Sequence, residues 1–322
     1  MAKDTNQNIS QLLNNMKRAK TVALFCHISP DPDTFCSAFA MKAALEKQGK
    51  QVDVFCDDDM PSCLEFMLDS SSVLKNSDNA YDFALSVDCS DITRLGNSAK
   101  IFLRAKDNGA VDHHKGHINF AKVTVLDCFS ASCSEIVMNI ILSQNLMDAD
   151  IAKILFGGIV ADSGCFGFSN VTKTTHLNAA KIYEYDFDYD EVLYNVFRKK
   201  EKKVFDLANR VLSKCKFYED GKIAVVRILK EDFLATNTTI FDTNGIVSSA
   251  VNVEGVEIAF AVSEVNPTNY KVSIRTKKYI DANECASCFG GGGHVRAAGC
   301  RLNGYLEDVC DKLLKVARDR LL

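Results

Sequence analysis

Histidine and aspartate residues recur in this 322-residue chain next to runs of apolar residues. The candidate metal ligands are His27, Asp31, Asp33, Asp88, His113 and Asp162. Imidazole nitrogen and carboxylate oxygen without a thiolate favour Mn²⁺, or Mg²⁺ as a second choice, over a structural zinc site. Four carboxylates and two imidazoles exceed what one ion needs, so we expect two divalent ions about 3.5–4 Å apart that share one carboxylate. Such a pair suits in-line attack on phosphorus, because it stabilises both the attacking and the leaving oxygen.

The segment Gly109–His117 holds the densest of these clusters and reads Gly-Ala-Val-Asp-His-His-Lys-Gly-His. The apolar pair Ala110-Val111 indicates the end of a buried strand. Successive side chains of a strand point to opposite faces, so Asp112 and His113 can face one ion only if the chain turns there. Turns at the carboxyl ends of strands are where α/β sheets bind their ligands. Taken by itself, the segment also fits a polar surface loop.

Three more candidate ligands lie between a predicted strand and a predicted helix. Residues 21–26 form a continuous apolar run, as expected for a central parallel strand. His27, Asp31 and Asp33 follow, and a helix is predicted over residues 34–48. Asp33 also fits the N-cap of that helix, which would explain one carboxylate but not the other two residues.

Two further aspartates end apolar segments. Asp88 follows a strand predicted over residues 81–87, and Asp91 fits the cap of a short helix behind it. Asp162 closes an apolar helix that is predicted over residues 151–160. A carboxylate is costly to bury at such a position unless it is paired or bound to a metal ion.

The first part of the chain alternates strands with helices, which is typical of a doubly wound, mainly parallel α/β sheet. The predicted strands are residues 21–26, 51–56, 81–87, a strand that ends at Asp112, and 122–127. The predicted helices are residues 8–19, 34–48, 132–144, 151–160 behind Asp148 as a cap, and 174–185. The acidic run Asp57-Asp58-Asp59 is interpreted as a solvated loop.

The second part of the chain has a different pattern. Residues 188–213 are charged and helical in their spacing and are interpreted as a connecting helix. The predicted strands after it are residues 222–229, 256–264 and 270–276. The predicted organisation is therefore a domain over residues 1–187, a helical linker over 188–214, and a smaller α/β domain over 215–322, with a cleft between the domains.

A glycine run, Gly290–Gly293, stands directly before His294 and Arg296. We expect a helix to start behind it, in which case the exposed backbone N–H groups would form a cradle for an anion. Glycine-rich segments are also common as plain turns. The basic residues behind the run favour phosphate recognition.

Composition limits the class of protein. A net charge of −4 and a pI near 5.9 argue against a long polyanion bound along a basic stripe, but not against a short anionic substrate. Thirteen cysteines scattered among apolar residues indicate free thiols in a reducing cytoplasm. The pair Cys285 and Cys288 has redox or zinc spacing, but packing is the preferred interpretation. Membrane partners are not expected, because no apolar run reaches the length of a membrane span.

Together the motifs resemble the DHH/DHHA1 phosphoesterases, and specifically their nanoRNase/pAp-phosphatase (NrnA-like) branch. The motifs that carry the resemblance are His27-x-x-x-Asp31-x-Asp33, Asp88 with Arg94-Leu-Gly96, Asp112-His113-His114, Gly158-Ile-Val-Ala-Asp162-Ser-Gly-x-Phe166 and Gly290-Gly-Gly-Gly-His294-x-x-Ala-Ala-Gly299. Three positions depart from the family pattern, namely Pro32, Gly116-His117 and Gly167.

The resemblance implies a role for each motif. His27 and Asp31 would bind one ion, whereas Asp33, His113 and Asp162 would bind the other, with Asp88 as the bridge. Asp112 would orient an imidazole, and His114 would face the substrate phosphate. The residues implied to hold substrate are Arg94, Arg275, Gly291, Gly292, Gly293, His294 and Arg296.

The resemblance further implies an enzyme that hydrolyses short RNA to mononucleotides and dephosphorylates 3′-phosphoadenosine 5′-phosphate (pAp) to AMP. The implied mechanism is attack by a hydroxide that two metal ions activate. One alternative is hydrolysis of the dinucleotide pApA or of cyclic di-AMP. Another is a catalytically silent nucleotide-binding regulator with the same fold. The expected partners are short RNA and related nucleotides, and the sequence leaves a homodimer open.

Overall fold

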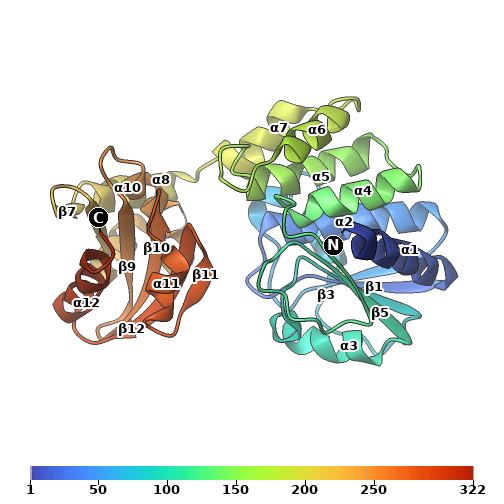
Figure 1. The fold of residues 1–322 in the computed structure, drawn as a ribbon, viewed down its shortest axis with the longest axis horizontal. Coiled ribbons are helices and arrows are strands. Elements are labelled where there is room, and N and C mark those ends of the chain that lie inside the picture. The colour runs from blue at the N-terminus through green and yellow to red at the C-terminus, as the bar shows by residue number, and fades with distance from the viewer. Residues whose placement is uncertain (1, 244, 322) are drawn as a thin grey trace. The chain divides into compact units, whose positions relative to one another are not determined.

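A computed structural model describes residues 2–243 and 245–321, apart from the side chains of residues 2–6 and of His294. The chain divides into two compact units, one ending at Lys199 and the other beginning at Lys200 (Figure 1). The division lies within the predicted linker. Each unit has its own sheet and its own hydrophobic core.

The first unit is built on a six-stranded parallel sheet with the order β3-β2-β1-β4-β5-β6. Its strands are β1 (Thr21–Phe25), β2 (Gln51–Phe55), β3 (Val73–Leu74), β4 (Phe83–Val87), β5 (Asp107–Asp112) and β6 (Val123–Leu126). The order reverses between β1 and β4, and ligands of doubly wound sheets bind beyond the carboxyl ends of the strands at such a point. The predicted fold class is confirmed.

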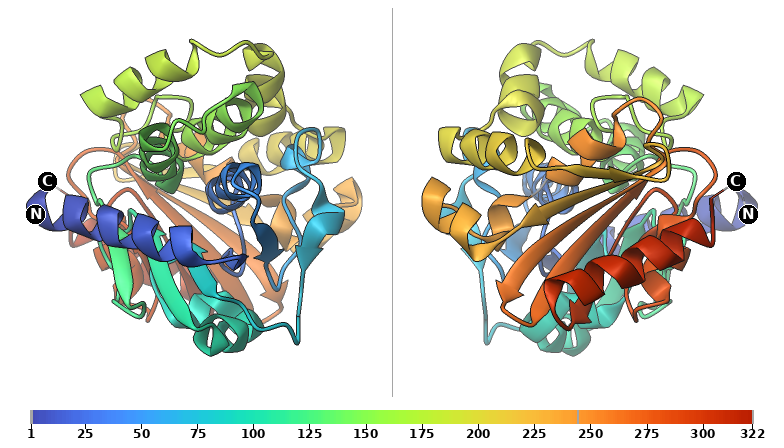
Figure 2. Two further views of the ribbon diagram at one scale, coloured as in Figure 1. Left: turned by 90° about the vertical axis from the view of Figure 1, so that its right-hand side faces the viewer. Right: turned by 90° about the vertical axis from the view of Figure 1, so that its left-hand side faces the viewer.

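Helices cover both faces of this sheet (Figures 1 and 2). They are α1 (Ala2–Arg18), α2 (Pro32–Lys47), α3 (Ala99–Arg104), α4 (Cys133–Ser143), α5 (Ala149–Asp162), α6 (Lys173–Ile182) and α7 (Tyr189–Leu193). Because strand side chains alternate between faces, Val22 and Leu24 of β1 join the core with α2, α4 and α5. Ala23 and Phe25 join the smaller core with α3, where the Phe25 ring stacks on Phe55 at 5.2 Å between centroids.

The predicted connecting helix over 188–213 is wrong as one element. Helix α7 runs into a π-helical turn at Tyr194–Arg198, and α8 (Lys202–Leu212) begins anew. A continuous helix would place Arg198 four residues before Lys202 and Lys199 four residues before Lys203. Like charges at this spacing destabilise a helix, which favours the break.

The second unit contains a mixed six-stranded sheet with the order β11-β12-β10-β9-β8-β7, in which only β8 and β9 pair in parallel among the residues described. Its strands are β7 (Lys216–Tyr218), β8 (Ile223–Ile228), β9 (Ile258–Asn266), β10 (Asn269–Thr276), β11 (Gly292–His294) and β12 (Ala297–Asn303). Its helices are α8, α9 (Lys230–Thr236), α10 (Ile246–Val251), α11 (Ala282–Ser287) and α12 (Leu306–Arg318). Alternate residues of β8 pack against α12 on one face and against α8 and α10 on the other.

The helix predicted behind the glycine run is also wrong. Gly292 and Gly293 belong to β11, which pairs with β12 as a hairpin. A Cβ atom at Gly291 would overlap the carbonyl oxygen of Gly299, and one at Gly293 would lie 2.5 Å from that of Ala297. The glycines therefore allow two backbone segments to approach closely, and no helix N-terminus is available there to bind an anion.

Within the described part of the chain, no helix is both long enough and apolar enough to cross a membrane.

Candidate metal centre

All six predicted ligands lie in the first unit, around the carboxyl ends of β1, β4 and β5. His27 and Asp88 follow β1 and β4, and His113 follows the last residue of β5. Asp31 and Asp33 stand at the start of α2, while Asp162 is the last residue of α5. The doubly wound topology thus brings together side chains that are up to 135 residues apart in sequence (162 − 27 = 135).

The six side chains form two groups, each able to hold an ion. In the first, ligand atoms of His27, Asp31 and Asp88 lie within 4.8 Å of one another. The same limit holds for Asp33, His113 and Asp162 in the second group. The two sets match the division that the family resemblance implies. Whether they bind ions in this way stays a prediction.

Asp88 connects the two groups. One of its oxygens, Oδ2, lies 3.6 Å from Nε2 of His27, and the other, Oδ1, lies 3.3 Å from Nε2 of His113. Neighbouring ligands of one octahedral ion with bonds of 2.0–2.1 Å are about 3 Å apart, so these separations suit atoms that share an ion. One carboxylate therefore faces both groups.

The environment of Asp88 fits a bound cation. Its Oδ1 atom is buried and has no hydrogen-bond partner among the described residues, although buried polar atoms are normally paired. Its φ angle of 56° is unusual for a residue other than glycine. Such strained conformations persist where the surrounding structure fixes them, and they concentrate at functional sites.

Asp31 and Asp33 are held by different backbone groups. Asp31, not Asp33, is the N-cap of α2, since its Oδ1 accepts a hydrogen bond from Thr34 N at 3.1 Å. Asp33 is fully buried and accepts from the N–H groups of Cys133 at 2.6 Å and Ser134 at 3.0 Å. These groups open α4, so the positive end of that helix stabilises the Asp33 carboxylate.

Gly158 of α5 makes room for this arrangement. A Cβ atom there would overlap Ser134 Oγ and lie 2.7 Å from Asp33 Oδ1. The sequence shows the glycine but not this contact, because Gly158 and Asp33 come from different helices.

The imidazoles turn Nε2 toward the carboxylates. Nδ1 of His113 lies 3.2 Å from the carbonyl oxygen of Ser130, and Nδ1 of His27 lies 2.9 Å from that of Ile28. A backbone carbonyl at Nδ1 fixes a metal-binding histidine with Nε2 as the ligand atom. Arg94 Nη2 also lies 2.9 Å from Nδ1 of His27. Arg94, which was predicted to bind substrate, is thus placed beside a candidate ligand.

The six candidate ligands together carry excess negative charge, because four of them are carboxylates. Burial raises the pKa of Asp33, and the neighbouring Asp88 and Asp162 raise it further. Burial also raises the pKa of Asp162 to about 6, despite the opposing effect of His113. Burial alone would lower the pKa of His113, but the neighbouring carboxylates of Asp162 and Asp88 outweigh it and raise the pKa to about 12. The site therefore attracts positive charge, which protons or divalent cations can supply.

Asp112 lies behind the two groups of ligands and contacts two other histidines. It is fully buried, with Oδ1 2.7 Å from Nδ1 of His114 and Oδ2 2.6 Å from Nδ1 of His117. Burial alone would raise its pKa, but the hydrogen bonds from both imidazoles lower it, so the carboxylate stays ionised. Sequence reasoning did not assign His117 to Asp112. The short separation of five residues between Asp112 and His117 was the one indication of this contact in the sequence.

The acidic run after β2 is not a solvated loop throughout, which corrects that interpretation. Asp57 accepts hydrogen bonds from Asn97 N at 2.5 Å and Ser98 N at 3.2 Å, and Asp58 accepts from Ser29 N at 2.6 Å. Position 29 lies in the loop of the first ligand motif, and positions 97–98 end the 3-10 helical segment Ile92–Ser98 that follows Asp88, so these carboxylates brace the segments behind both motifs.

The predicted substrate residues of the second unit cluster near the β11–β12 hairpin. Arg275 pairs with Ala297 in the sheet, and burial lowers its pKa. Arg296 donates to the carbonyl oxygens of Ile280, at 2.9 Å, and Lys278, so it braces the preceding turn. Gly291, Gly292 and Gly293 lie in or beside β11, whereas the side chain of His294 is outside the described part. Substrate binding by these residues stays a prediction.

The cysteine pair has two environments. Cys285 is buried and Cys288 is exposed, so packing accounts only for the first. All thirteen cysteines are free thiols.

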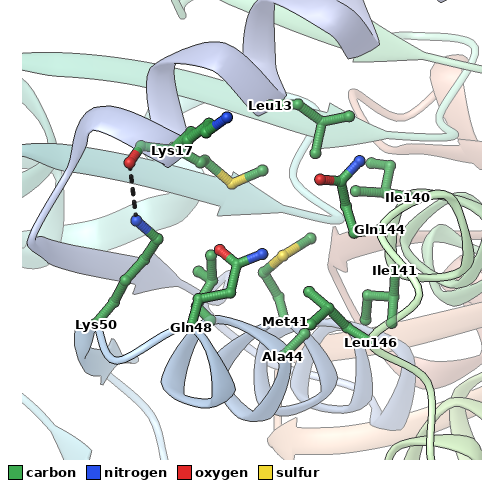
Figure 3. Close-up of a pocket in the computed structure, with 12 residues that line it drawn as sticks. Leu13, Lys17, Met41, Ala44, Gln48, Lys50, Ile140, Ile141, Gln144 and Leu146 are labelled. Carbon is green, nitrogen blue, oxygen red and sulfur yellow. Dashed lines mark hydrogen bonds between the residues drawn. The ribbon is translucent and has the colours of Figure 1, made fainter.

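A pocket of about 300 Å³ lies between α1, α2 and α4 (Figure 3). Its lining includes Met16, Met41 and Ile141, with Lys50 at its edge. It lies near the last turns of α2 and α4, whereas Asp33 lies at the first turns of both. The first residue of α2 in the lining, Met41, is eight residues after Asp33, which is about 12 Å along the helix, so this pocket is separate from the metal centre.

Comparison with known proteins agrees with this geometry. The family model "DHH family, N-terminal domain" matches residues 21–159, and the model "DHHA1 domain" matches residues 220–321. A Bacteroides fragilis protein described as exopolyphosphatase-related has the same fold, with a TM-score of 0.90 at 21% identity over 98% of this chain and 96% of its own.

Curated relatives match along almost their whole length. The Bacillus subtilis protein named "Bifunctional oligoribonuclease and PAP phosphatase NrnA" is 25% identical, over 95% of this chain and 96% of its own. The Thermus thermophilus protein of the same name is 29% identical, over 92% and 88%. A Streptococcus mutans protein, named as a probable example, is 26% identical over 92% and 94%. These matches confirm the family resemblance: the chain belongs to the DHH/DHHA1 phosphoesterases.

Proposed function

We propose that this phosphoesterase hydrolyses short oligoribonucleotides to mononucleotides and dephosphorylates pAp to AMP. The names of the Bacillus subtilis and Thermus thermophilus relatives support this substrate class. The observation that carries the proposal is the position of Asp88, whose two oxygens face both groups of candidate ligands at 3.6 and 3.3 Å. Two ions that share a carboxylate suit displacement at phosphorus.

In this proposal His27 and Asp31 hold one divalent ion, Asp33, His113 and Asp162 hold the other, and Asp88 holds both. Mn²⁺ is the preferred ion, because the donors are nitrogen and carboxylate oxygen. When bound, the ions would supply an activated water and neutralise charge on the phosphate. The protein's contribution is to fix the ligand positions through the starts of α2 and α4 and the end of α5.

We propose that His114 gives a proton to the leaving oxygen. Burial alone would lower its pKa, but the hydrogen bond to Asp112 and the charge of Asp88 raise it, so the ring holds a proton more readily than usual. Asp112 orients the ring through Nδ1 at 2.7 Å. Nε2 is then the atom that we assign to the substrate side.

Selection is assigned to the second unit. We propose that Arg275, the segment Gly291–Gly293, His294 and Arg296 hold a terminal nucleotide or phosphate. The N–H groups of Gly291 and Gly293 already donate to Ala286 O and Asn283 Oδ1, so the expected role of these glycines is close approach of the backbone to the ligand. Burial lowers the pKa of Arg275, as expected for a cation withdrawn from water, and an anionic group nearby would offset that cost. We place the protein in a reducing cytoplasm, which the free cysteines support.

The test is a comparison of turnover on four substrates with added Mn²⁺: RNA of two to five nucleotides, pAp, pApA and cyclic di-AMP. The proposal expects the first two to be the best substrates. Faster turnover of pApA or cyclic di-AMP would reassign the substrate within the family. Binding without hydrolysis of any of them would favour the regulatory alternative.

A further inference from the structure

Two phenylalanines near the metal centre are largely exposed. Phe129 lies between β6 and α4 with 75% of its surface exposed, and Phe168 lies between α5 and α6 with 58% exposed. Single exposed apolar residues are ordinary on protein surfaces. These two differ from ordinary exposed residues because hydrogen bonds fix the backbone of each next to a candidate ligand.

Phe129 is next in sequence to the residue whose carbonyl oxygen contacts His113. It directly precedes Ser130, whose carbonyl oxygen lies 3.2 Å from Nδ1 of His113. Its own N–H donates to Asp127 Oδ1 at 3.0 Å, and Ser130 N donates to Asp127 O at 3.1 Å. The turn that carries Phe129 is therefore fixed against the His113 ring.

The backbone of Phe168 contacts the residue that follows Asp162, the carboxylate beside His113. Its N–H donates at 3.0 Å to the carbonyl oxygen of Ser163, the residue after Asp162. Asp162 Oδ2 is in turn 3.3 Å from Nε2 of His113. Each phenylalanine thus stands in a loop whose backbone also holds one member of the His113–Asp162 pair.

One side chain ties their two loops together. Asn170 Nδ2 donates to the carbonyl oxygen of Ala131 at 2.9 Å and to that of Asp162 at 2.9 Å. Ala131 is two residues beyond Phe129, and Asn170 is two residues beyond Phe168. The separation of the two loops is therefore fixed at this point.

The loop that carries Phe168 adopts a costly conformation. Gly164, Cys165 and Phe166 have successive φ angles of 57°, 54° and 64°, although two of them carry side chains. Non-glycine residues in this region are strained, and they persist only where the surrounding structure fixes them. The turn brings Phe168 back over Gly164, where a Cβ atom would overlap its ring. Part of the ring is thus close to the Gly164 backbone, while the residue stays largely exposed.

We propose that Phe129 and Phe168 form a stacking site for a nucleobase next to the scissile phosphate. This inference rests on the proposed function, because it assigns the base of that substrate to the first unit. Aromatic side chains stack on any of the bases, so the site would bind RNA without sequence preference. It would also supply affinity for a short, uncharged part of the substrate, which suits a protein of net charge −4.

The test uses a dinucleotide with 2-aminopurine at one end and a non-hydrolysable methylene phosphonate link, together with the same compound lacking that base. Binding to the Mn²⁺-loaded protein is measured by calorimetry, and stacking by quenching of 2-aminopurine fluorescence. Phe129→Ala and Phe168→Ala should each weaken binding of the complete compound about tenfold, which is the effect of losing one stacking partner. Binding of the compound without the base should stay within about twofold of wild type, and quenching should decrease.

Leu103→Ala is the matched control. Leu103 is 61% exposed on α3, which precedes the amino end of β5 and so lies at the opposite edge of the sheet from the ligands. This variant should bind both compounds like wild type. Phe168→Trp should retain quenching, whereas Phe168→Leu should lose it, because leucine keeps apolar bulk without an aromatic face.

The outcomes separate the two proposals. Quenching that depends on the phenylalanines, in a protein that hydrolyses no short RNA, would support the stacking site and contradict the proposed function. Rapid hydrolysis of short RNA with unchanged binding in both alanine variants would contradict the stacking site alone. Equal loss of affinity for both compounds would also overturn it, since the phenylalanines would then support the loops and not the base.

Discussion

The carboxyl edge of the first sheet and the glycine-rich hairpin of the second were both predicted to contact the substrate, but their polar groups are held in different ways. At the first, Asp33 is fixed by two backbone N–H groups, and His113 by a carbonyl oxygen. At the second, Arg296 is itself used to brace a turn. The first region has carboxylates and imidazoles that the backbone holds in place. The second has close-packed glycine backbone and a few basic side chains. The difference suggests a division between chemistry in the first unit and selection in the second.

The largest effect should come from Asp88→Ala. Because Asp88 faces both ligand groups, its loss should remove all measurable hydrolysis at any Mn²⁺ concentration. Asp91→Asn is the control. Asp91 stands three residues after Asp88, caps the short helix that follows it, and has no contact with the ligands among the interactions described. That variant should keep both its stability and its activity, because asparagine caps a helix about as well as aspartate. Substantial activity in Asp88→Ala would break the shared-carboxylate account.

Asp112→Asn should have an intermediate effect. The side chain of Asp112 contacts the imidazoles of His114 and His117. Its hydrogen bond to the proposed ligand His113 is to the backbone N–H of that residue, at 2.8 Å, and not to the imidazole. The loss of a group that orients another side chain at a metal site typically lowers activity about 10–100-fold. The measurement is kcat together with the number of Mn²⁺ ions bound, which should not change. A complete loss equal to that of Asp88→Ala would place Asp112 among the ion ligands.

Gly158→Ala should lower activity about tenfold by moving Asp33, because the added Cβ would lie 2.7 Å from Oδ1 of that carboxylate. Overpacking of this kind also costs about 1–3 kcal/mol of stability. Gly116→Ala is the matched control, since a Cβ there meets no atom within 4 Å. Mn²⁺ titration should show weaker binding only in the first variant. Unaltered Mn²⁺ affinity in Gly158→Ala would mean that Asp33 does not need this position.

Arg296→Ala should have the smallest effect, and it should depend on the substrate. If the second unit selects, cleavage of short RNA should fall several-fold, while hydrolysis of bis-p-nitrophenyl phosphate should change little. If the contacts of Arg296 to Ile280 and Lys278 matter only for the fold, both activities should fall together with the thermal stability. The second result would remove Arg296 from the selection region.

The sequence predicts the metal centre better than the hairpin for physical reasons. Buried parallel strands appear as continuous apolar runs, so the residues behind them can be placed at one edge of a sheet. The cap of α2 was assigned to the wrong residue: Asp33 was considered, whereas Pro32 at the first helical position makes Asp31 the N-cap. The β11–β12 hairpin gives no such signal, since Ala297-Ala-Gly has little strand character.

Other features depend on contacts that no local pattern contains. One is the contact of Gly158 with Asp33, which come from different helices. Another is the hydrogen bond from Asn170 to the carbonyl oxygen of Ala131, which is 39 residues earlier in the sequence. Helix α12 is a different case. No helix was predicted there from the sequence, although Val309, Leu313, Leu314 and Ala317 repeat at helical spacing.

The most direct test of the central claim is the number and coupling of the Mn²⁺ ions in the first unit. The account predicts that the full-length protein binds two Mn²⁺ per chain, with an electron paramagnetic resonance spectrum of an exchange-coupled pair that is lost in Asp88→Ala. Binding should release protons and weaken as the pH falls, because neighbouring carboxylates raise the pKa of His27 to about 10 against the effect of burial. One isolated Mn²⁺ per chain, or two ions without coupling in the wild-type protein, would contradict the shared role of Asp88.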